Sequence, residues 1–274
     1  MSRILVLGGG GVTGIAWHLG LICGLQRAGV FLGDADTVIG TSAGSVVGTG
    51  LAAGVDVEAA VALQREPATD PTRTGPARGA EWLTAMAVLL DPSVPPLQAR
   101  ARVGAMALAA GLDEQRYLAR MAELVPVTEW PERDLRIVVV DAADGRDVVL
   151  DSASGVPLLR AVAASCAVPG LMPPVTIGDR RYIDGGVRLG AGADLAAGAE
   201  RLVVIAPLAA IGRDRIVEEI ASTGAAKTLL IEPDQEALTA FGPNFMDVSR
   251  RPAAVSAGLR QGSALADTVR SVWT

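Results

Sequence analysis

The sequence predicts an α/β protein with a mostly parallel central sheet and helices on both of its faces. Short apolar runs occupy residues 4–7, 37–40, 137–140, 202–206 and 228–231. Their length and continuity are typical of strands that are buried on both sides. Apolar residues at helical spacing separate the first two runs, which makes a strand–helix–strand unit. Such a unit joins parallel strands through a right-handed crossover.

The first elements along the chain are a strand, a glycine-rich loop and a helix. The strand over residues 4–7 ends in four consecutive glycines, residues 8–11. Apolar residues then recur at helical spacing until Gly29, a typical C-terminal stop for a helix. The second strand covers residues 37–40 and leads through a short turn into a segment of helical pattern.

Residues 56–130 differ in character and are expected to form a helical insertion within a single domain of residues 1–274. This segment is rich in alanine, proline and arginine, and its helical spacing is clearest over residues 82–90 and 103–117. Breaks are expected at the prolines of the segment, which are Pro67, Pro71, Pro92, Pro95 and Pro96. An insertion of this kind commonly covers a site and shapes the access of substrate.

After the insertion the pattern returns to strands. Asp144-Gly145 lies between the apolar run at residues 137–140 and a further run at residues 147–150. An Asp-Gly pair between two such runs indicates a hairpin turn. The runs at residues 202–206 and 228–231 are expected to complete the sheet.

The composition argues against several classes of protein. The net charge of −6 argues against nucleic-acid binding, which requires a concentrated basic surface. The N-terminus lacks the apolar core and the cleavage site of a signal peptide. Long uncharged stretches are interrupted by glycines or prolines, so we expect buried strands rather than membrane spans. A cytoplasmic location is therefore expected, with Cys23 and Cys166 buried and reduced.

The stretch Gly40-Thr41-Ser42-Ala43-Gly44 is the strongest indication of chemistry in this chain. It joins the predicted strand at residues 37–40 to a segment of helical pattern at residues 46–53. A Gly-x-Ser-x-Gly sequence between a strand and a helix forces the serine onto a sharp turn with its hydroxyl group exposed. Serine is a poor nucleophile until a base removes its proton, so the motif requires a base elsewhere in the sequence.

The four glycines are expected at the same edge of the sheet as Ser42, because the carboxyl ends of parallel strands meet there. Backbone N–H groups beside a nucleophile stabilise the oxyanion of a tetrahedral intermediate. Gly9-x-Gly11-x-x-Gly14 also matches the dinucleotide-binding fingerprint. That fingerprint requires an acidic residue at the end of the second strand, whereas Asp34 and Asp36 precede this strand. Nucleotide binding is therefore the weaker alternative.

The candidate base is a carboxylate. The chain contains one histidine, His18, which lies in the helix after the glycines and is expected to pack or hydrogen-bond behind the loop. One histidine and two distant cysteines provide no metal cluster, and no cofactor is expected. Asp184, before Gly185-Gly186, is the first candidate, although Asp-Gly is also a common turn signal. Asp141, at the end of a predicted strand, is its competitor.

Three motifs in this order resemble the patatin-like phospholipases: Gly9-Gly10-Gly11-Val12-Thr13-Gly14, Gly40-Thr41-Ser42-Ala43-Gly44 and Asp184-Gly185-Gly186. Residues 164–175 are similar to the Ala-Ser-x-Ala-x-Pro segment of that family. The resemblance covers residues 4–45 and 135–190, and more weakly residues 241–262. It implies a three-layer α/β/α sandwich and a Ser-Asp dyad without histidine. Carried onto this sequence, Ser42 is the nucleophile, Asp184 is its base, and the N–H groups of Gly9, Gly10 and Gly11 form the oxyanion hole.

The resemblance implies a serine acyl hydrolase that cleaves lipid acyl esters through an acyl-enzyme. Its partner is a lipid or acyl-ester substrate, and transient contact with a membrane surface is compatible with that activity. The chain has Thr13 where the family usually has Arg or Lys. This departure motivates the alternative of a catalytically weak lipid-binding or regulatory protein on the same fold. The sequence leaves the lipid class and the oligomeric state open, and its abundance of alanine and arginine suggests a bacterial source.

Overall fold

The computed structural model describes residues 2–66, 79–125 and 127–274. Within these ranges the strands form one sheet, with the neighbour order β5-β6-β3-β2-β1-β7-β8 and with β4 also paired to β3. The parallel strands are β1 (Arg3–Leu7), β2 (Thr37–Gly40), β3 (Asp134–Asp141), β7 (Arg201–Ile205) and β8 (Lys227–Ile231). The antiparallel strands are β4 (Asp147–Leu150), β5 (Val175–Ile177) and β6 (Arg180–Asp184). This mixed, mostly parallel sheet confirms the predicted α/β class.

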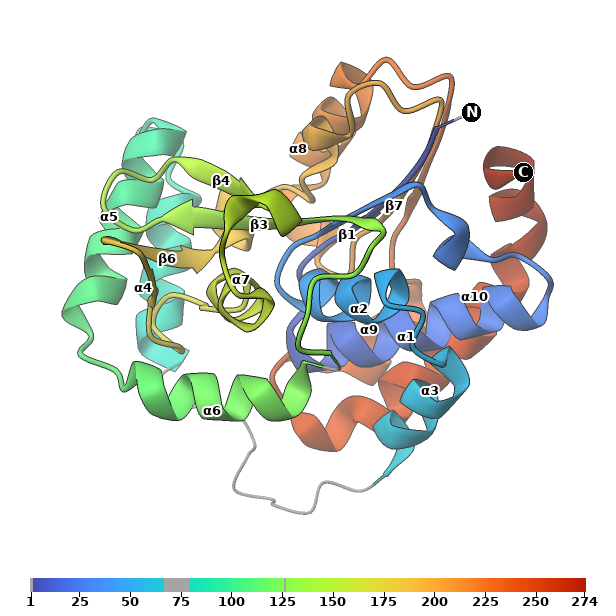
Figure 1. Ribbon diagram of the computed structural model, residues 1–274, viewed down its shortest axis with the longest axis horizontal. Helices are drawn as coiled ribbons and strands as arrows, with labels where there is room; N and C mark the ends of the chain where they lie inside the picture. Colours follow the sequence, from blue (N-terminus) through green and yellow to red (C-terminus); the bar gives the residue numbers. More distant parts are fainter. Residues whose placement is uncertain (1, 67–78, 126) are drawn as a thin grey trace.

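Helices flank the sheet on both faces (Figure 1). Successive residues of β1 point to opposite faces, as in any strand: Leu5 and Leu7 join the larger core, whereas Ile4 and Val6 join the core on the other face. The larger core is covered by α1 (Gly11–Arg27), α2 (Ala43–Ala52), α7 (Leu158–Ser165), α9 (Gln235–Phe241) and α10 (Arg251–Trp273). The opposite core is covered by α8 (Ala209–Ser222). Short 3₁₀ turns complete the connections: η1 (Leu32–Asp34), η3 (Ser152–Ser154), η4 (Gly185–Arg188), η5 (Ala193–Ala196) and η6 (Val248–Arg250).

Between β2 and β3 along the chain, the described residues form four helices in addition to α2, although these two strands pair directly in the sheet. They are α3 (Val57–Arg65), α4 (Gly79–Leu89), α5 (Pro96–Ala109) and α6 (Glu114–Leu124). The prediction of one helical segment over residues 103–117 is wrong, because this range is divided between α5 and α6. Gly111 has a left-handed φ of +61°, and the Asp113 side chain then caps α6 by accepting the Arg116 N–H. Residues 67–78, with the breaks expected at Pro67 and Pro71, lie outside the described residues.

The antiparallel strands bring Asp184 to the point where β2 ends. The Asp144-Gly145 turn joins β3 to β4, as predicted, and β6 runs back along β3. Ile137 of β3 pairs with Gly40, and Val139, two residues further along, pairs with Asp184. The carboxyl ends of β2 and β6 therefore approach the same part of β3.

Both cysteines are free, as expected, but only Cys23 is a buried residue. Cys166 is partly exposed, because it follows the last turn of α7, where the backbone leaves the helix. Its thiol group is nevertheless shielded, and burial raises the pKa of that thiol. Among the described helices, none combines the length and the apolar character needed to cross a bilayer.

Candidate active site

Ser42 lies on a strained turn between β2 and α2. Its backbone has φ 53° and ψ −120°, and a positive φ is uncommon for a residue other than glycine. The flanking glycines have no room for a side chain. A Cβ atom on Gly44 would lie 1.9 Å from the carbonyl oxygen of Leu7, and one on Gly40 would lie 2.6 Å from that of Gly44. The close approach of strand and helix explains why small residues surround the serine.

A second serine holds this turn to the sheet. Ser165, the last residue of α7, is fully buried. Its hydroxyl oxygen accepts the Ser42 N–H at 2.9 Å, and the hydroxyl group donates to the Val138 carbonyl oxygen at 2.8 Å. In the sequence, Ser165 belongs to the segment that resembles the family, with no role of its own predicted. A serine within the otherwise apolar end of α7 is the signal that points to this role.

Asp184 is buried beside Ser42, at the end of β6. The residue is 4% exposed, and its Oδ1 accepts the Gly186 N–H at 2.7 Å. Burial raises the pKa of this carboxyl from its usual value of 3.8 to about 7, because desolvation disfavours the charged form. The Gly186 N–H and a polar contact with the Ser42 side chain act in the opposite direction. The pair therefore combines a buried serine on a strained turn with a carboxyl group that titrates near neutral pH.

The glycine loop after β1 packs directly against this pair. A Cβ atom on Gly9 would lie 3.5 Å from the Cβ atom of Ser42. A Cβ atom on Gly10 would lie 2.7 Å from the side chain of Pro207, so the loop could not carry a side chain there without moving its neighbour. A methyl group on Gly9 would thus be in van der Waals contact with Ser42, so the loop passes close beside the serine.

The N–H groups of the glycine loop differ in their partners. The Gly8 N–H donates to the Ile205 carbonyl oxygen at 2.9 Å, which ties the start of the loop to β7. Within the described ranges, the N–H groups of Gly9, Gly10 and Gly11 have no acceptor in the protein. They precede and begin α1, where the helix dipole favours negative charge.

Thr13 links the glycine loop to the segment around Phe245. The Thr13 side chain is fully buried, and both its N–H and its hydroxyl group are directed to the Phe245 carbonyl oxygen, at 3.1 and 3.3 Å. The Phe245 ring in turn lies 5.3 Å from the Trp82 ring of α4, measured between centroids. The position that departs from the family pattern therefore has a packing and hydrogen-bonding role in this chain.

Ser42 and Asp184 line one pocket, whose walls are mainly apolar. The glycine loop forms part of the wall, and α4 covers another side. The apolar lining residues include Trp82, Ala85, Met86, Leu89, Val168, Val187, Leu189, Leu208, Ile211, Ile216 and Phe245. The insertion was expected to cover a site, but none of these residues was identified individually. The sequence indicated only helical spacing over residues 82–90, and the fold shows which residues of α4 face the pocket.

The competing bases have other partners. His18 is fully buried behind the loop, with Nε2 3.3 Å from the Ile205 carbonyl oxygen. Burial lowers the pKa of His18 to about 4. Asp141 accepts the Ala143 N–H at 2.9 Å and forms an ion pair with Arg180. Neither His18 nor Asp141 lines the pocket that contains Ser42.

Asp34 and Asp36 are not placed to bind the ribose of a dinucleotide at the glycine loop. Asp36 accepts the Arg3 N–H at 2.7 Å, at the beginning of β1, whereas the glycine loop follows the end of that strand. Asp34 lies in η1, also before β2.

Among the side chains that the structure describes, no group of three or more His, Cys, Asp or Glu residues is placed to bind a metal ion.

Comparison with curated proteins gives distant relatives in mycobacteria. An NTE family protein of Mycobacterium tuberculosis strain CDC 1551 is 31% identical over 187 residues, which cover 67% of this chain and 26% of that protein. An NTE family protein of strain H37Rv is 30% identical with the same coverage. The chain thus spans about a quarter of the length of the curated relatives that it matches.

The fold also resembles a solved structure. The crystal structure of VipD from Legionella pneumophila matches 97% of this chain and 67% of that chain, with a TM-score of 0.50 and 16% identity. Residues 5–197 match the family described as patatin-like phospholipase, and this range contains the glycine loop, the serine turn and Asp184. The chain belongs to the patatin-like phospholipase family.

Proposed function

We propose that this chain is a serine acyl hydrolase that cleaves lipid acyl esters. The observation that carries the proposal is the shared pocket. Ser42 on its strained turn, Asp184 with its raised pKa and the glycine loop line the same, mainly apolar cavity. The apolar walls suit an acyl chain, whereas these polar groups suit the ester.

In the proposed mechanism Ser42 Oγ attacks the acyl carbonyl carbon while its proton passes to the ionised Asp184. The carbonyl oxygen becomes an oxyanion, which the N–H groups of Gly9, Gly10 and Gly11 stabilise. Asp184 then returns the proton to the leaving alcohol as the carbon–oxygen bond breaks, which leaves an acyl-serine. Water then attacks the acyl-serine and gives its proton to Asp184. Asp184 passes this proton to Ser42 Oγ as the acyl carbon–oxygen bond breaks, which releases the fatty acid and regenerates Ser42.

The electrostatics of the pair support this assignment of roles. A general base works best when its pKa lies near the operating pH, and burial raises the pKa of Asp184 to about 7. His18 is buried behind the loop and does not line the pocket, and its own burial lowers its pKa to about 4. A carboxylate base therefore suits the geometry better than the single histidine.

A panel of esters with varied acyl chains and head groups tests the proposal. The Ser42→Ala variant is expected to lose hydrolysis of every substrate that the wild-type protein cleaves, while its near-UV circular dichroism remains native. Ser256→Ala, which changes an exposed serine of α10, provides the matched control and should retain full activity. Wild-type turnover by the Ser42→Ala variant would contradict the proposal. Lipid binding without turnover by the wild-type protein would favour the regulatory alternative.

A further inference from the structure

The segment that follows Asp184 forms one wall of the pocket. Residues 185–193, which we call the strap, contribute Gly186, Val187, Leu189, Gly190 and Ala191 to the pocket lining. Leu189 has φ +60° and ψ 22°, a left-handed conformation that costs energy for a residue with a Cβ atom. Such a conformation persists only when its surroundings hold it in place.

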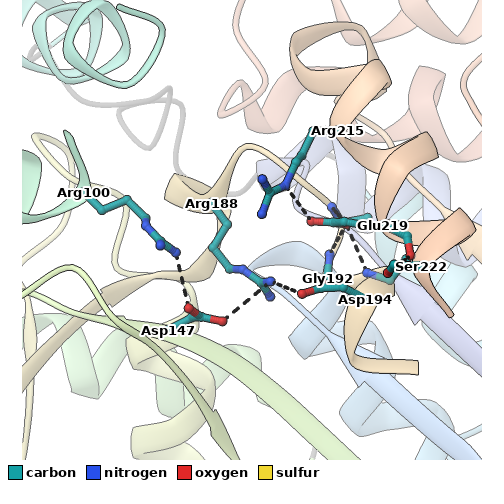
Figure 2. Close-up of polar contacts among 10 residues, drawn as sticks. Arg100, Asp147, Arg188, Gly192, Asp194, Arg215, Glu219 and Ser222 are labelled. Carbon is teal, nitrogen blue, oxygen red and sulfur yellow. Dashed lines mark hydrogen bonds and ion pairs between the residues drawn. The ribbon is translucent and has the colours of Figure 1, made fainter. Parts of the chain in front are cut away.

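Glu219 of α8 holds the strap from behind (Figure 2). Its side chain is buried, and one carboxylate oxygen, Oε2, accepts three consecutive backbone N–H groups. The donors are Ala191 at 3.0 Å, Gly192 at 2.9 Å and Ala193 at 3.1 Å. Hydrogen bonds to a charged acceptor are stronger than those between neutral groups, so they offset part of the cost of burying the carboxylate.

The carboxylate also lies directly against the pocket wall. A Cβ atom on Gly190 would lie 1.9 Å from Oε1 of Glu219, so only a glycine fits between the pocket and this charge. Arg215, one turn earlier in α8, approaches Oε1 at 3.6 Å between Nε and oxygen. A displacement of Glu219 would therefore be transmitted to Gly190 without an intervening side chain.

A second set of ion pairs holds the strap at Arg188, which directly precedes Leu189 in the sequence. The buried Arg188 pairs with Asp194 at 2.6 Å and approaches Asp147 of β4 at 3.6 Å. Arg100 of the insertion helix α5 contacts the same Asp147 at 3.4 Å. Figure 2 shows Arg100, Asp147, Arg188 and Asp194 joined in one series of ion pairs. Leu189 is thus flanked by two charged anchors within five residues of the chain.

Supporting an apolar wall with buried charged side chains carries a free-energy cost of desolvation. Well-packed apolar residues at such positions are often neutral or stabilising, and a buried ionic group can instead serve to fix one conformation. Three N–H groups converging on one oxygen fix both the position and the direction of the strap backbone. This geometry suits a wall whose position must not vary.

We propose that Glu219 is a positioning residue that fixes the strap as a rigid wall of the acyl pocket and thereby sets the discrimination between acyl-chain lengths. The inference rests on the proposed acyl hydrolase function. It assigns Glu219 no contact with the substrate, since the residue acts through Gly190 and its neighbours. The first turn of the strap, next to Asp184, is held separately by the Asp184–Gly186 hydrogen bond.

The test compares kcat/KM for p-nitrophenyl esters from butyrate to palmitate in three variants. Glu219→Ala removes the acceptor of three N–H groups, so the ratio between the best ester and its longer neighbours should fall by about tenfold, the scale of one methylene group in a defined pocket. The rate with butyrate, which does not extend along the pocket, should change little. Glu219→Gln retains an oxygen acceptor but loses the charge, so the same ratio should fall measurably, by less than in Glu219→Ala. Glu218→Ala, an exposed neighbour in α8, should leave the profile unchanged.

The chain-length profile separates positioning from a general loss of stability, which would lower all the rates together. The proposal is overturned if folded Glu219→Ala keeps the wild-type profile, or if it loses activity equally with every ester. If Glu219→Ala does not fold, Glu219→Gln decides: an amide accepts these N–H groups more weakly, so a folded Gln variant with no change in profile also overturns it. Calorimetric titration with free fatty acids of the same lengths provides a readout that needs no catalysis. If the wild-type protein hydrolyses no ester, the proposed function fails. The claim about the pocket wall is then still decided by whether Glu219→Ala alters the length dependence of fatty-acid affinity.

Discussion

Replacing Asp184 by asparagine should make the protein more stable at neutral and alkaline pH while removing its catalysis. The change keeps the shape of the side chain and an oxygen that can accept the Gly186 N–H. It removes the charge that burial disfavours. The native pKa of about 7 against an ordinary value of 3.8 corresponds to a penalty of about 4 kcal/mol for the ionised form, at 1.36 kcal/mol per pKa unit.

The sign of the pH dependence follows from proton binding. Between pH 3.8 and about 7 the native protein retains on Asp184 a proton that the unfolded chain has released. Stability contributed by this group is therefore fully present below pH 3.8 and is lost as the pH rises through 7. At pH 5 only about 2 kcal/mol of the penalty is present, so the advantage of the Asn variant should shrink by about 3 kcal/mol between pH 8 and pH 5.

Urea unfolding of both proteins at several pH values measures this difference. The two proteins share every other titratable group, so subtracting the free energies of unfolding isolates Asp184. Equal pH dependence of the two proteins would refute a raised pKa at this position. A variant that is less stable than the wild-type protein at pH 8 would show that the charged carboxylate contributes more through its hydrogen bonds than burial costs.

Three further predictions concern the same site. The wild-type kcat/KM for a soluble ester should rise with pH to a plateau with a midpoint near 7, because the base must be ionised; a flat profile from pH 5 to 8 would argue against Asp184 as that base. His18→Ala should lower thermal stability by opening a cavity behind the loop, while kcat falls far less than in Ser42→Ala. If kcat falls equally in the two folded variants, a triad that includes His18 would replace the proposed dyad. Gly44→Ala should destabilise the protein by more than about 2 kcal/mol in urea unfolding, since its Cβ atom would meet the Leu7 carbonyl oxygen; a native-like midpoint would contradict the close packing of strand and helix.

The strands next to the serine could be predicted because their chemistry is local. β1 and β2 are short apolar runs that end in glycines, and both patterns are visible within a few residues. β6, by contrast, has the sequence Arg180-Arg181-Tyr182-Ile183-Asp184, which carries charges and too few apolar residues to indicate a strand. Its antiparallel pairing with β3 is a long-range feature, and this pairing places Asp184 beside the serine turn.

The supporting residues of the site were beyond sequence reasoning for a similar reason. Arginine and glutamate are typical of solvated surfaces, and only the folded structure shows that Arg188 and Glu219 are buried. The helix predicted over residues 103–117 failed because its apolar spacing continues across Gly111, whose left-handed backbone ends α5. The burial of Arg188 and Glu219 thus depends on contacts between distant segments, whereas the break at Gly111 is local and was missed.

Labelling with a fluorophosphonate tests the central claim most directly, because the reagent reacts with an activated serine without requiring the natural substrate. Mass spectrometry of the labelled, folded protein should find a single adduct on the peptide that contains Ser42. The labelling rate should fall as Asp184 becomes protonated below pH 7 and should be strongly reduced in Asp184→Asn. Labelling at another serine, or no adduct on folded wild-type protein, would contradict the proposed Ser42–Asp184 chemistry.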